Sequence, residues 1–379
     1  MSAEWKECTI AELGNVAGGA TPSTKEPQNY DGGNISWITP KDLSTFSGRY
    51  ISRGERNITE KGLKSCSAQM LPKHSILFSS RAPIGYIAIA DCPLCTNQGF
   101  KSVIPNENID YLFLYYLLKY NKGKIENMGS GTTFKEVSGA TMKSIKVSVP
   151  ISKCTQRIIG NILGKIDDKI ESNNRANNIL QQQAQALFKA WFVNYIPFGG
   201  VMPDGWINTE LGKIIDITSG KRPIERSIEK TQEFSIPLVG ATSVMGFTNA
   251  VLYNEKILVT GRVGTHGVIQ RFSKSCWASD NTFVIKSKYY EFVCQILHAI
   301  DFQSMNRGST QPLITQSDLK KIPLILPTAD ILGKFESIVG VLMAQYEQNI
   351  SENDKLATLR DTLLPKLMSG EIDVSNVKI

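Results

Sequence analysis

Side chains suited to hydrogen bonding with nucleobase edges recur at matching places in the two halves of this sequence. Arg can form a forked contact with guanine, Asn and Gln with adenine, and Ser or Thr with either. In the first half these candidates, with two lysines beside them, are Ser79, Ser80, Arg81, Thr96, Asn97, Gln98, Lys101, Ser130, Thr132, Thr133 and Lys135. In the second half they are Arg222, Thr260, Arg262, Thr265, His266, Ser279, Asn281, Arg307, Ser309, Thr310 and Gln311. The chemistry that they suit is recognition of a sequence of bases.

The charge of the chain agrees with a polyanionic partner. The formal net charge is +7, whereas residues 328–379 are acidic. We therefore expect a nucleic acid to bind the basic parts and a protein to bind the tail. The cations that could neutralise phosphates are Lys25, Lys41, Arg49, Arg53, Lys101, Lys135, Lys221, Arg222 and Lys274.

The sequence motifs of common enzymes are missing. There is no Gly-x-x-x-x-Gly-Lys-[Ser/Thr] phosphate loop, no Gly-x-Gly-x-x-Gly after a strand and no Asn-Pro-Pro-aromatic stretch. The three histidines, His74, His266 and His298, are not at helical spacing from one another. We therefore expect no catalytic residues in this chain, with a nuclease or methyltransferase that acts alone kept as an alternative.

The cysteines favour a reducing compartment over a metal site. Cys92 and Cys95 form one pair that Cys66 and His74 could complete, but a structural zinc site usually needs two such pairs. Buried thiols are the favoured interpretation, so we expect no metal. Seven cysteines without regular spacing, and no apolar stretch longer than Tyr111–Leu118, predict a cytoplasmic protein without a membrane segment.

Two long amphipathic helices are predicted to position the candidate residues. In residues 155–193 and 330–368, apolar residues recur in steps of three and four. A helix of this length makes a rod of roughly 58 Å, which suits a spacer. Shifted by 176 positions, Gly164 falls on Gly340, and Asn173 and Asn177 fall on Asn349 and Asn353. Two such stripes most simply bury each other, and buried Asn residues would fix the register.

The rest of the chain repeats as well. Thr9-Ile-Ala-Glu-Leu-Gly14 returns as Thr209-Glu-Leu-Gly212, and a strand ending in a hydroxyl and Arg81 returns as one ending at Arg262. The predicted plan is a mixed α/β domain at 1–150, a helix at 151–195, a second such domain at 196–327, and a helix with tail at 328–379. The predicted fold class is α+β, with the two domains related by a pseudo-twofold axis and separated by antiparallel coiled-coil helices.

Several long phrases resemble one protein family. They are Ile76-Leu-Phe-Ser-Ser-Arg-Ala-Pro-Ile-Gly-Tyr86, Cys95-Thr-Asn-Gln-Gly-Phe100, Ile162-Leu-Gly-Lys-Ile-Asp-Asp-Lys-Ile-Glu171, Gln183-Ala-Gln-Ala-Leu-Phe-Lys-Ala-Trp-Phe192 and Leu359-Arg-Asp-Thr-Leu-Leu-Pro-Lys-Leu-Met-Ser-Gly-Glu371. In their order, over nearly the whole chain, they resemble the DNA-specificity subunit of type I restriction–modification systems. The second domain fits the family phrases less closely than the first.

The resemblance implies a fold and a set of partners. In this family two target-recognition domains, held apart by antiparallel helices, each read one half of a split sequence in double-stranded DNA. The subunit binds no cofactor and docks two methylation subunits and two restriction subunits, which use S-adenosylmethionine, ATP and Mg. From the helix ends we expect the docking residues to be Leu187, Phe188, Trp191, Phe192, Leu363, Leu364 and Leu367. Packing of the aromatic members against the facing helix, and a coiled-coil scaffold with two protein-binding domains, stay open as alternatives.

Overall fold

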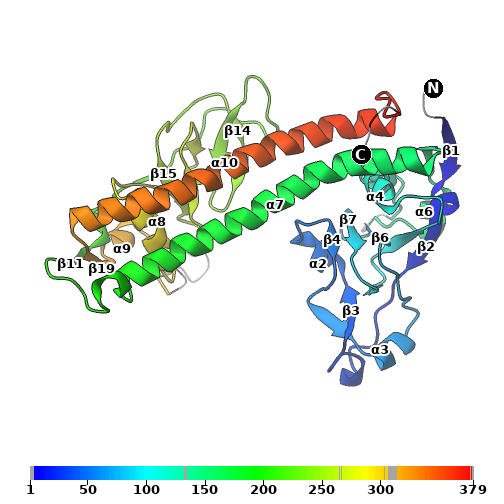
Figure 1. The fold of residues 1–379 in the computed structure, drawn as a ribbon, viewed down its shortest axis with the longest axis horizontal. Helices are drawn as coiled ribbons and strands as arrows, with labels where there is room; N and C mark the ends of the chain where they lie inside the picture. The colour runs from blue at the N-terminus through cyan, green and yellow to red at the C-terminus, as the bar shows by residue number, and fades with distance from the viewer. Residues whose placement is uncertain are drawn as a thin grey trace. The chain divides into compact units, whose positions relative to one another are not determined.

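Two helices of 40 residues each run through the protein, α7 (Lys153–Phe192) and α10 (Ala329–Met368) (Figure 1). The computed structural model describes residues 4–131, 135–263, 265, 267–302, 304–305, 314–375 and 377. The chain divides into two compact units: unit 1 is Met1–Asn174 with Ile350–Ile379, and unit 2 is Arg175–Asn349. Each long helix therefore gives one half to each unit, where the predicted division had assigned whole helices to segments of their own.

Unit 1 contains three sheets. The largest has the order β2 (Gly14–Gly18), β9 (Lys101–Pro105), β6 (Ile76–Ser80), β7 (Ile84–Ala90) and β4 (Tyr50–Ile51). A second sheet orders β5 (Arg56–Ile58), β3 (Ile35–Ile38) and β8 (Cys95–Thr96), and β1 (Trp5–Thr9) pairs with β10 (Lys146–Pro150). The shorter helices are α1 (Ile10–Leu13), α2 (Pro40–Ser44), α3 (Glu60–Lys64), α4 (Tyr111–Tyr120), α5 (Lys122–Asn127) and α6 (Gly139–Ser144).

Unit 2 repeats this arrangement, with fewer strands among its described residues. Its sheets have the orders β12 (Asp216–Ser219), β18 (Thr282–Lys286), β15 (Ile257–Gly261), β16 (Gln270–Phe272), and β14 (Val244–Thr248), β13 (Ile236–Val239), β17 (Trp277–Ala278). β11 (Ile207–Glu210) pairs with β19 (Pro323–Leu326), as β1 does with β10. The helices α8 (Tyr290–Ala299) and α9 (Gln316–Lys320) complete the unit. The prediction of an α+β chain with a repeated mixed domain and two long helices is confirmed.

An apolar helix forms the centre of each unit's core. In unit 1, Leu112 to Leu118 of α4 are all buried, with Ile159 and Leu163 of α7 and Leu367 of α10 in the same cluster. In unit 2, Phe292 of α8 lies with Ala184 of α7 and with Phe335, Val339 and Met343 of α10. Because α4 is apolar on nearly every side, it needs cover on nearly every side, whereas α8 also carries Glu291, Gln295 and His298. The long helices supply part of that cover in both units.

Buried Asn side chains join the two long helices, as the sequence pattern predicts. In unit 1, Asn173 Nδ2 donates to Asn353 Oδ1 over 2.9 Å. In unit 2, Asn349 Nδ2 donates to Asn177 Oδ1 over 2.8 Å. In both units the residue number falls along α10 as it rises along α7, so the helices are antiparallel within each unit.

Candidate nucleic-acid interface

The same three turns meet in each unit. In unit 1, the turn after β2 contacts the turn after β8 through the Ala20 N–H and the Thr96 carbonyl, 3.0 Å apart. The turn after β6 joins them because Ser80 N–H donates to Gly99 over 2.7 Å. In unit 2 the corresponding bonds run from Lys221 to Ala278 over 2.9 Å and from Arg262 to Asn281 over 3.0 Å. We call this set of turns, residues 18–22, 79–81 and 96–99 in unit 1 and 219–223, 260–262 and 278–281 in unit 2, the turn surface.

Glycine is required where the turns approach most closely. A Cβ on Gly19 would lie 2.2 Å from the carbonyl oxygen of Asn97, and one on Gly220 would lie 2.1 Å from that of Ser279. Real Cβ atoms do not approach backbone this closely, so any other residue would force the turns apart. The sequence signal was a glycine three residues before a proline, Gly19 before Pro22 and Gly220 before Pro223. The sequence could not identify the turns that these glycines contact.

Matching positions on the turn surface carry different chemistry in the two units. In unit 1, Thr21 Oγ1 donates to Gln98 Oε1, which is a neutral pair. In unit 2, Arg222 Nε lies 3.3 Å from Asp280 Oδ2, which is an ion pair. Arg222 is 84% exposed in its side chain, so its guanidinium also faces solvent. One backbone frame therefore presents two different sets of donors and acceptors.

Two arginines of the turn surface are held by polar side chains. Arg81 Nη1 lies 3.4 Å from Glu136 Oε2, and Lys101 Nζ lies 3.4 Å from the other oxygen of the same carboxylate. Two cations thus share one anion and leave a positive charge. Arg262 Nη1 donates to Ser219 Oγ over 3.4 Å. Sequence reasoning missed Thr21, Glu136 and Ser219, because their importance comes from contacts with distant residues.

Five of the predicted hydroxyl residues are buried, and for Ser79 and Ser80 the expected role in base contact needs correction. Ser79, Ser80, Thr96, Thr260 and Ser279 are all 4% exposed or less. Ser79 Oγ donates to the Pro83 carbonyl and accepts from Tyr86 N–H, both over 2.8 Å. Ser80 Oγ donates to the Gly99 carbonyl over 3.2 Å. The hydroxyls of Ser79 and Ser80 therefore stabilise the turns and do not project toward a ligand.

The remaining predicted residues differ in their placement. Those that are exposed are Gln98, Ser130, Lys135, Arg222, Thr265 and Asn281, and those half-buried are Arg81, Asn97, Lys101 and Arg262. Ser130 and Lys135 lie on a loop that reaches the turn surface through Val137 N–H, which donates to the Ser80 carbonyl over 2.9 Å. The predicted residues outside the described part of the chain are Thr132, Thr133, His266, Arg307, Ser309, Thr310 and Gln311.

Arg49, proposed above as a phosphate contact, is instead an internal residue. Its side chain is 5% exposed and its Nε lies 3.1 Å from Glu171 Oε1 on α7. In unit 2, Arg271 Nη2 lies 3.7 Å from Glu347 Oε1 on α10. Because 171 and 347 differ by the repeat shift of 176, both units fasten a buried arginine to the same position of a long helix.

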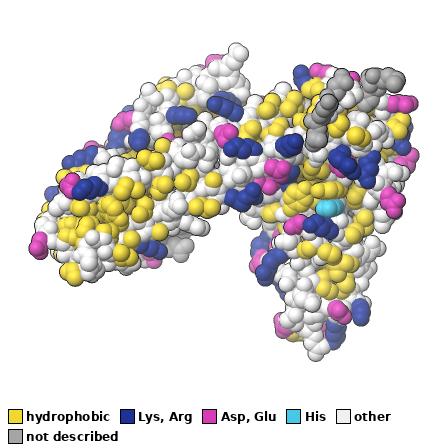
Figure 2. Space-filling model, in the orientation of Figure 1, with side chains coloured by type: hydrophobic (Ala, Val, Ile, Leu, Met, Phe, Trp, Pro, Cys, Tyr) yellow, Lys and Arg dark blue, Asp and Glu magenta, His cyan; other side chains and the backbone are white. Residues whose placement is uncertain are grey.

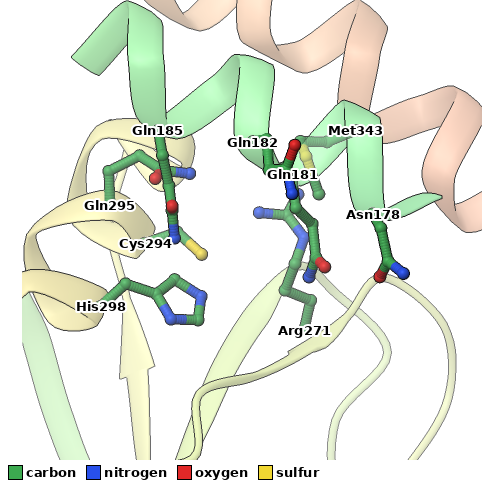
Figure 3. Close-up of a pocket in the computed structure, with 9 residues that line it drawn as sticks. All are labelled: Asn178, Gln181, Gln182, Gln185, Arg271, Cys294, Gln295, His298 and Met343. Atoms are coloured by element: carbon green, nitrogen blue, oxygen red, sulfur yellow. The ribbon is translucent and has the colours of Figure 1, made fainter. Parts of the chain in front are cut away.

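A polar pocket of about 360 Å³ lies in unit 2 among α7, α8 and α10 (Figure 3). Cys294 and His298 of α8 both face it, with Gln181 and Gln185 of α7 on the other side. Burial raises the pKa of the Cys294 thiol, and burial followed by the charge of Arg271 lowers the pKa of His298. Both groups are therefore neutral near pH 7, whereas a nucleophilic cysteine needs a thiolate.

The corresponding place in unit 1 is filled. Tyr116 donates to Asp167 Oδ2 over 2.6 Å, and Arg360 Nη1 lies 2.7 Å from Asp167 Oδ1. The residue 176 positions after Asp167 is Met343, and the residue 176 positions before Arg360 is Ala184. Because Met343 and Ala184 cannot form this network, the pocket follows from divergence of the repeat.

The cysteines considered for zinc lie in separate surroundings. Cys95 is buried, and Cys92 Sγ donates to the Ser52 carbonyl over 3.3 Å. Among the described residues, no three His, Cys, Asp or Glu side chains are grouped so as to hold a metal ion. In the same part of the chain, none of the helices combines the length and the apolar character that crossing a membrane requires.

The predicted docking residues lie partly inside the units. Phe188, Trp191 and Phe192 pack against Phe292 and Phe335, with ring centroids 4.9–6.3 Å apart for the pairs that they form. Leu187 packs with the same cluster, whereas Leu363, Leu364 and Leu367 belong to the core of unit 1. Beyond Phe192, Val193, Ile196 and Val201 are 56–70% exposed. Figure 2 shows hydrophobic side chains gathered where α7 ends.

Comparison with known proteins gives matches over nearly the whole chain. The family model described as "Type I restriction modification DNA specificity domain" matches residues 2–182 and 203–359. The specificity subunit of the type I restriction enzyme MjaIX from Methanocaldococcus jannaschii is 35% identical over 412 residues, covering 99% of this chain and 95% of that protein. The EcoR124I/EcoR124II specificity subunit from Escherichia coli is 32% identical over 162 residues, covering 41% of this chain and 39% of that protein.

A solved structure shares the fold. The crystal structure of a type I restriction–modification S subunit from M. genitalium matches with a TM-score of 0.63 and 18% identity. The match covers 97% of this chain and 96% of that one.

Proposed function

Because the chain belongs to the family of type I restriction–modification DNA specificity subunits, we propose that it reads a bipartite sequence in double-stranded DNA, one half-site with each unit. The observation that carries this proposal is the turn surface. It occurs in both units on the same backbone frame, and it carries different side chains in each. Two copies of one frame with different chemistry suit recognition of two different half-sites.

Arg81 and Arg262 are the side chains that we propose for base contacts. Each is half-buried at the end of a strand, and among the described residues each has one polar contact to a side chain, at 3.4 Å. A guanidinium held in this loose way can exchange its partner for guanine. Lys135 and Arg222 are exposed at the margins and suit phosphates.

We propose further that α7 and α10 set the gap between the half-sites. Asn pairs on either side of the junction between the units, Asn173–Asn353 and Asn177–Asn349, fix the register of the two helices. A rod of fixed register keeps a fixed length, which a spacer needs. A pseudo-twofold relation between the units belongs to the same proposal.

Two methylation subunits are the proposed partners at the apolar ends of the helices, with two restriction subunits added for cleavage. The exposed Val193, Ile196 and Val201 beside the aromatic cluster offer apolar area for such a partner in unit 2. In this proposal Phe188, Trp191 and Phe192 lie beneath the contact surface and support it. S-adenosylmethionine, ATP and Mg would act in the partner subunits, in the cytoplasm.

Selection of random duplex DNA on the purified full chain, with the methylation subunit present and absent, tests the proposal. We expect the recovered sequences to contain two fixed blocks separated by an unspecified gap of constant length. A single block, or no enrichment, would contradict bipartite reading. Enrichment of no DNA, together with binding of proteins by both units, would favour the alternative of a coiled-coil scaffold.

A further inference from the structure

A second pocket in unit 2 adjoins the turn surface and has a different character from the polar pocket of Figure 3. Its volume is about 340 Å³, and Arg222, Ile224, Met245, Ser279 and Asn281 are among the residues that line it. Arg222 and Asn281 already belong to the turn surface. The pocket therefore lies where DNA would bind if the proposed function is correct, and the inference below rests on that function.

Apolar side chains stand in solvent around this pocket. Ile224 is 97% exposed and Met245 is 50% exposed. Isolated exposed apolar residues are common, but here two line one pocket with two exposed cations, Arg222 and Arg226. The pocket also contains the carboxylate of Asp280, which pairs with Arg222 and leaves the lining with a net positive charge. Basic surroundings bring a phosphate backbone close, whereas Ile and Met offer nothing to a phosphate. In a DNA groove, the apolar group that they can contact is the methyl group of thymine.

Polar groups of the same pocket match the rest of an A·T pair. In the major groove thymine presents its O4 acceptor beside the methyl group, and adenine presents N7 and its amino group. Asn281 is exposed and carries a carboxamide that can pair with adenine in both ways. Ser279 Oγ is buried at the pocket wall and has no hydrogen-bond partner in the described part of the chain. A buried hydroxyl without a partner is costly, and a bound acceptor such as thymine O4 would relieve that cost.

We propose that this pocket makes unit 2 specific for an A·T pair in its half-site. Ile224 and Met245 contact the thymine methyl group, and Asn281 contacts the adenine edge. Ser279 supplies a donor to thymine O4. The specificity of unit 2 therefore comes from the apolar contact with the thymine methyl group and from the Asn281 amide, in addition to Arg262.

Replacement of thymine by deoxyuridine tests the methyl contact directly, because it removes only that group. The probe is the DNA recovered from the selection experiment, with each thymine of the two half-sites replaced in turn. One replacement in the half-site of unit 2 should weaken binding about fourfold, which is the effect of one buried methyl group. With Ile224→Ala, the preference for thymine over deoxyuridine should shrink, because Met245 alone then contacts the methyl group.

Ile228→Ala is the matched control. Ile228 lies on the same loop and is 89% exposed, but it is not among the residues that line the pocket. This variant should keep the fourfold preference for thymine. Ser279→Ala should lower the preference for thymine while the free protein keeps its thermal stability, because the hydroxyl has no partner to lose. A loss of stability would instead give Ser279 a structural role.

The outcomes separate this inference from the proposed function. If the protein selects two half-sites but deoxyuridine has no effect in either, or if the half-site of unit 2 contains only G·C pairs, the pocket does not read thymine. If the protein selects no sequence at all, the proposed function itself is contradicted. A methyl effect of equal size in wild type and Ile224→Ala also overturns the assignment.

Discussion

Buried polar residues show how the two repeats solve the same problem with different side chains. The N-terminus of α4 is capped by Asp110, which accepts from Leu112 N–H and Phe113 N–H over 3.0 Å. The N-terminus of α8 is capped by Glu336 of α10, which accepts from Glu291 N–H and Phe292 N–H. Shifted back by 176, position 336 is Gly160, where a Cβ would lie 2.9 Å from Phe113 N. The helix of unit 1 is therefore capped by a residue next to it in the sequence, whereas the helix of unit 2 is capped by a residue of another helix.

The carboxylate of Glu336 makes the stability of unit 2 depend on pH. Burial raises its pKa above the ordinary 4.5, although the two backbone N–H groups oppose this shift. A raised folded-state pKa gives a contribution that is fully present below the unfolded value and is lost as pH rises through the folded value. In Glu336→Gln this dependence disappears. Thermal unfolding from pH 4 to 7 should therefore show wild type losing stability relative to the variant, and a constant difference would contradict the assignment.

The proposed base contacts of Arg81 and Arg262 can be tested one at a time. Arg81→Ala should weaken cognate binding by about 1–3 kcal/mol and relax one half-site only, and Arg262→Ala should do so for the other. Competition binding against single-base variants measures both effects. Equal loss on random DNA would reduce each arginine to a phosphate contact. Lys169→Ala is a control, since this exposed lysine on α7 pairs with Glu352 away from the turn surface.

At the scale of the elements, the long helices could be predicted closely and the turn surface could not. The helices follow from a local period in the sequence, and their observed bounds differ by at most two residues from the predicted 155–193 and 330–368. The sequence did not predict the burial of Ser79 and Ser80. β6 is buried along its whole length, so its last two residues do not belong to an exposed turn. Contacts such as that of Thr21 with Gln98 join turns far apart in the chain, so no periodic pattern in the sequence predicts them.

The Asn pair of unit 2 tests how the helices keep their register. Asn177 and Asn349 are each 6% exposed. Asn349→Leu leaves a buried amide without its partner and should cost about 1–3 kcal/mol of unfolding free energy. Replacing both by Leu should recover most of that loss, because no amide then stays unpaired. Chemical denaturation of the two single variants and the double variant measures this.

The control for the Asn pair is Asn178→Leu, which replaces an exposed Asn of α7 in the same unit and should change stability by less than about 0.5 kcal/mol. A double variant as unstable as the sum of the two single variants would show that the amides do not act as a pair.

At the scale of the whole molecule, the internal repeat connects fold to function. The family match falls in two segments, 2–182 and 203–359, as the repeat does. Sheet order, capping, buried arginines and turn surfaces recur in both units, whereas the exposed side chains differ. A sequence can diverge in this way when the frame must be kept and each unit must recognise something different.

The length of the helices is the feature on which the bipartite proposal depends. The junction between the units falls at 174/175 in α7 and at 349/350 in α10, between the two Asn pairs. Four residues inserted at both points add about one turn, or about 6 Å, and keep each Asn pair within its own unit. The same insertion in the linker at Gly199-Gly200, outside both helices, is the control.

The gap in the DNA selected by the doubly lengthened protein is the most direct measurement. We predict that both half-sites stay unchanged while the gap grows by about two base pairs, since base pairs are spaced about 3.4 Å apart. The linker control should keep the original gap. An unchanged gap in the lengthened protein, with both half-sites still selected, would contradict the spacer role of the helices.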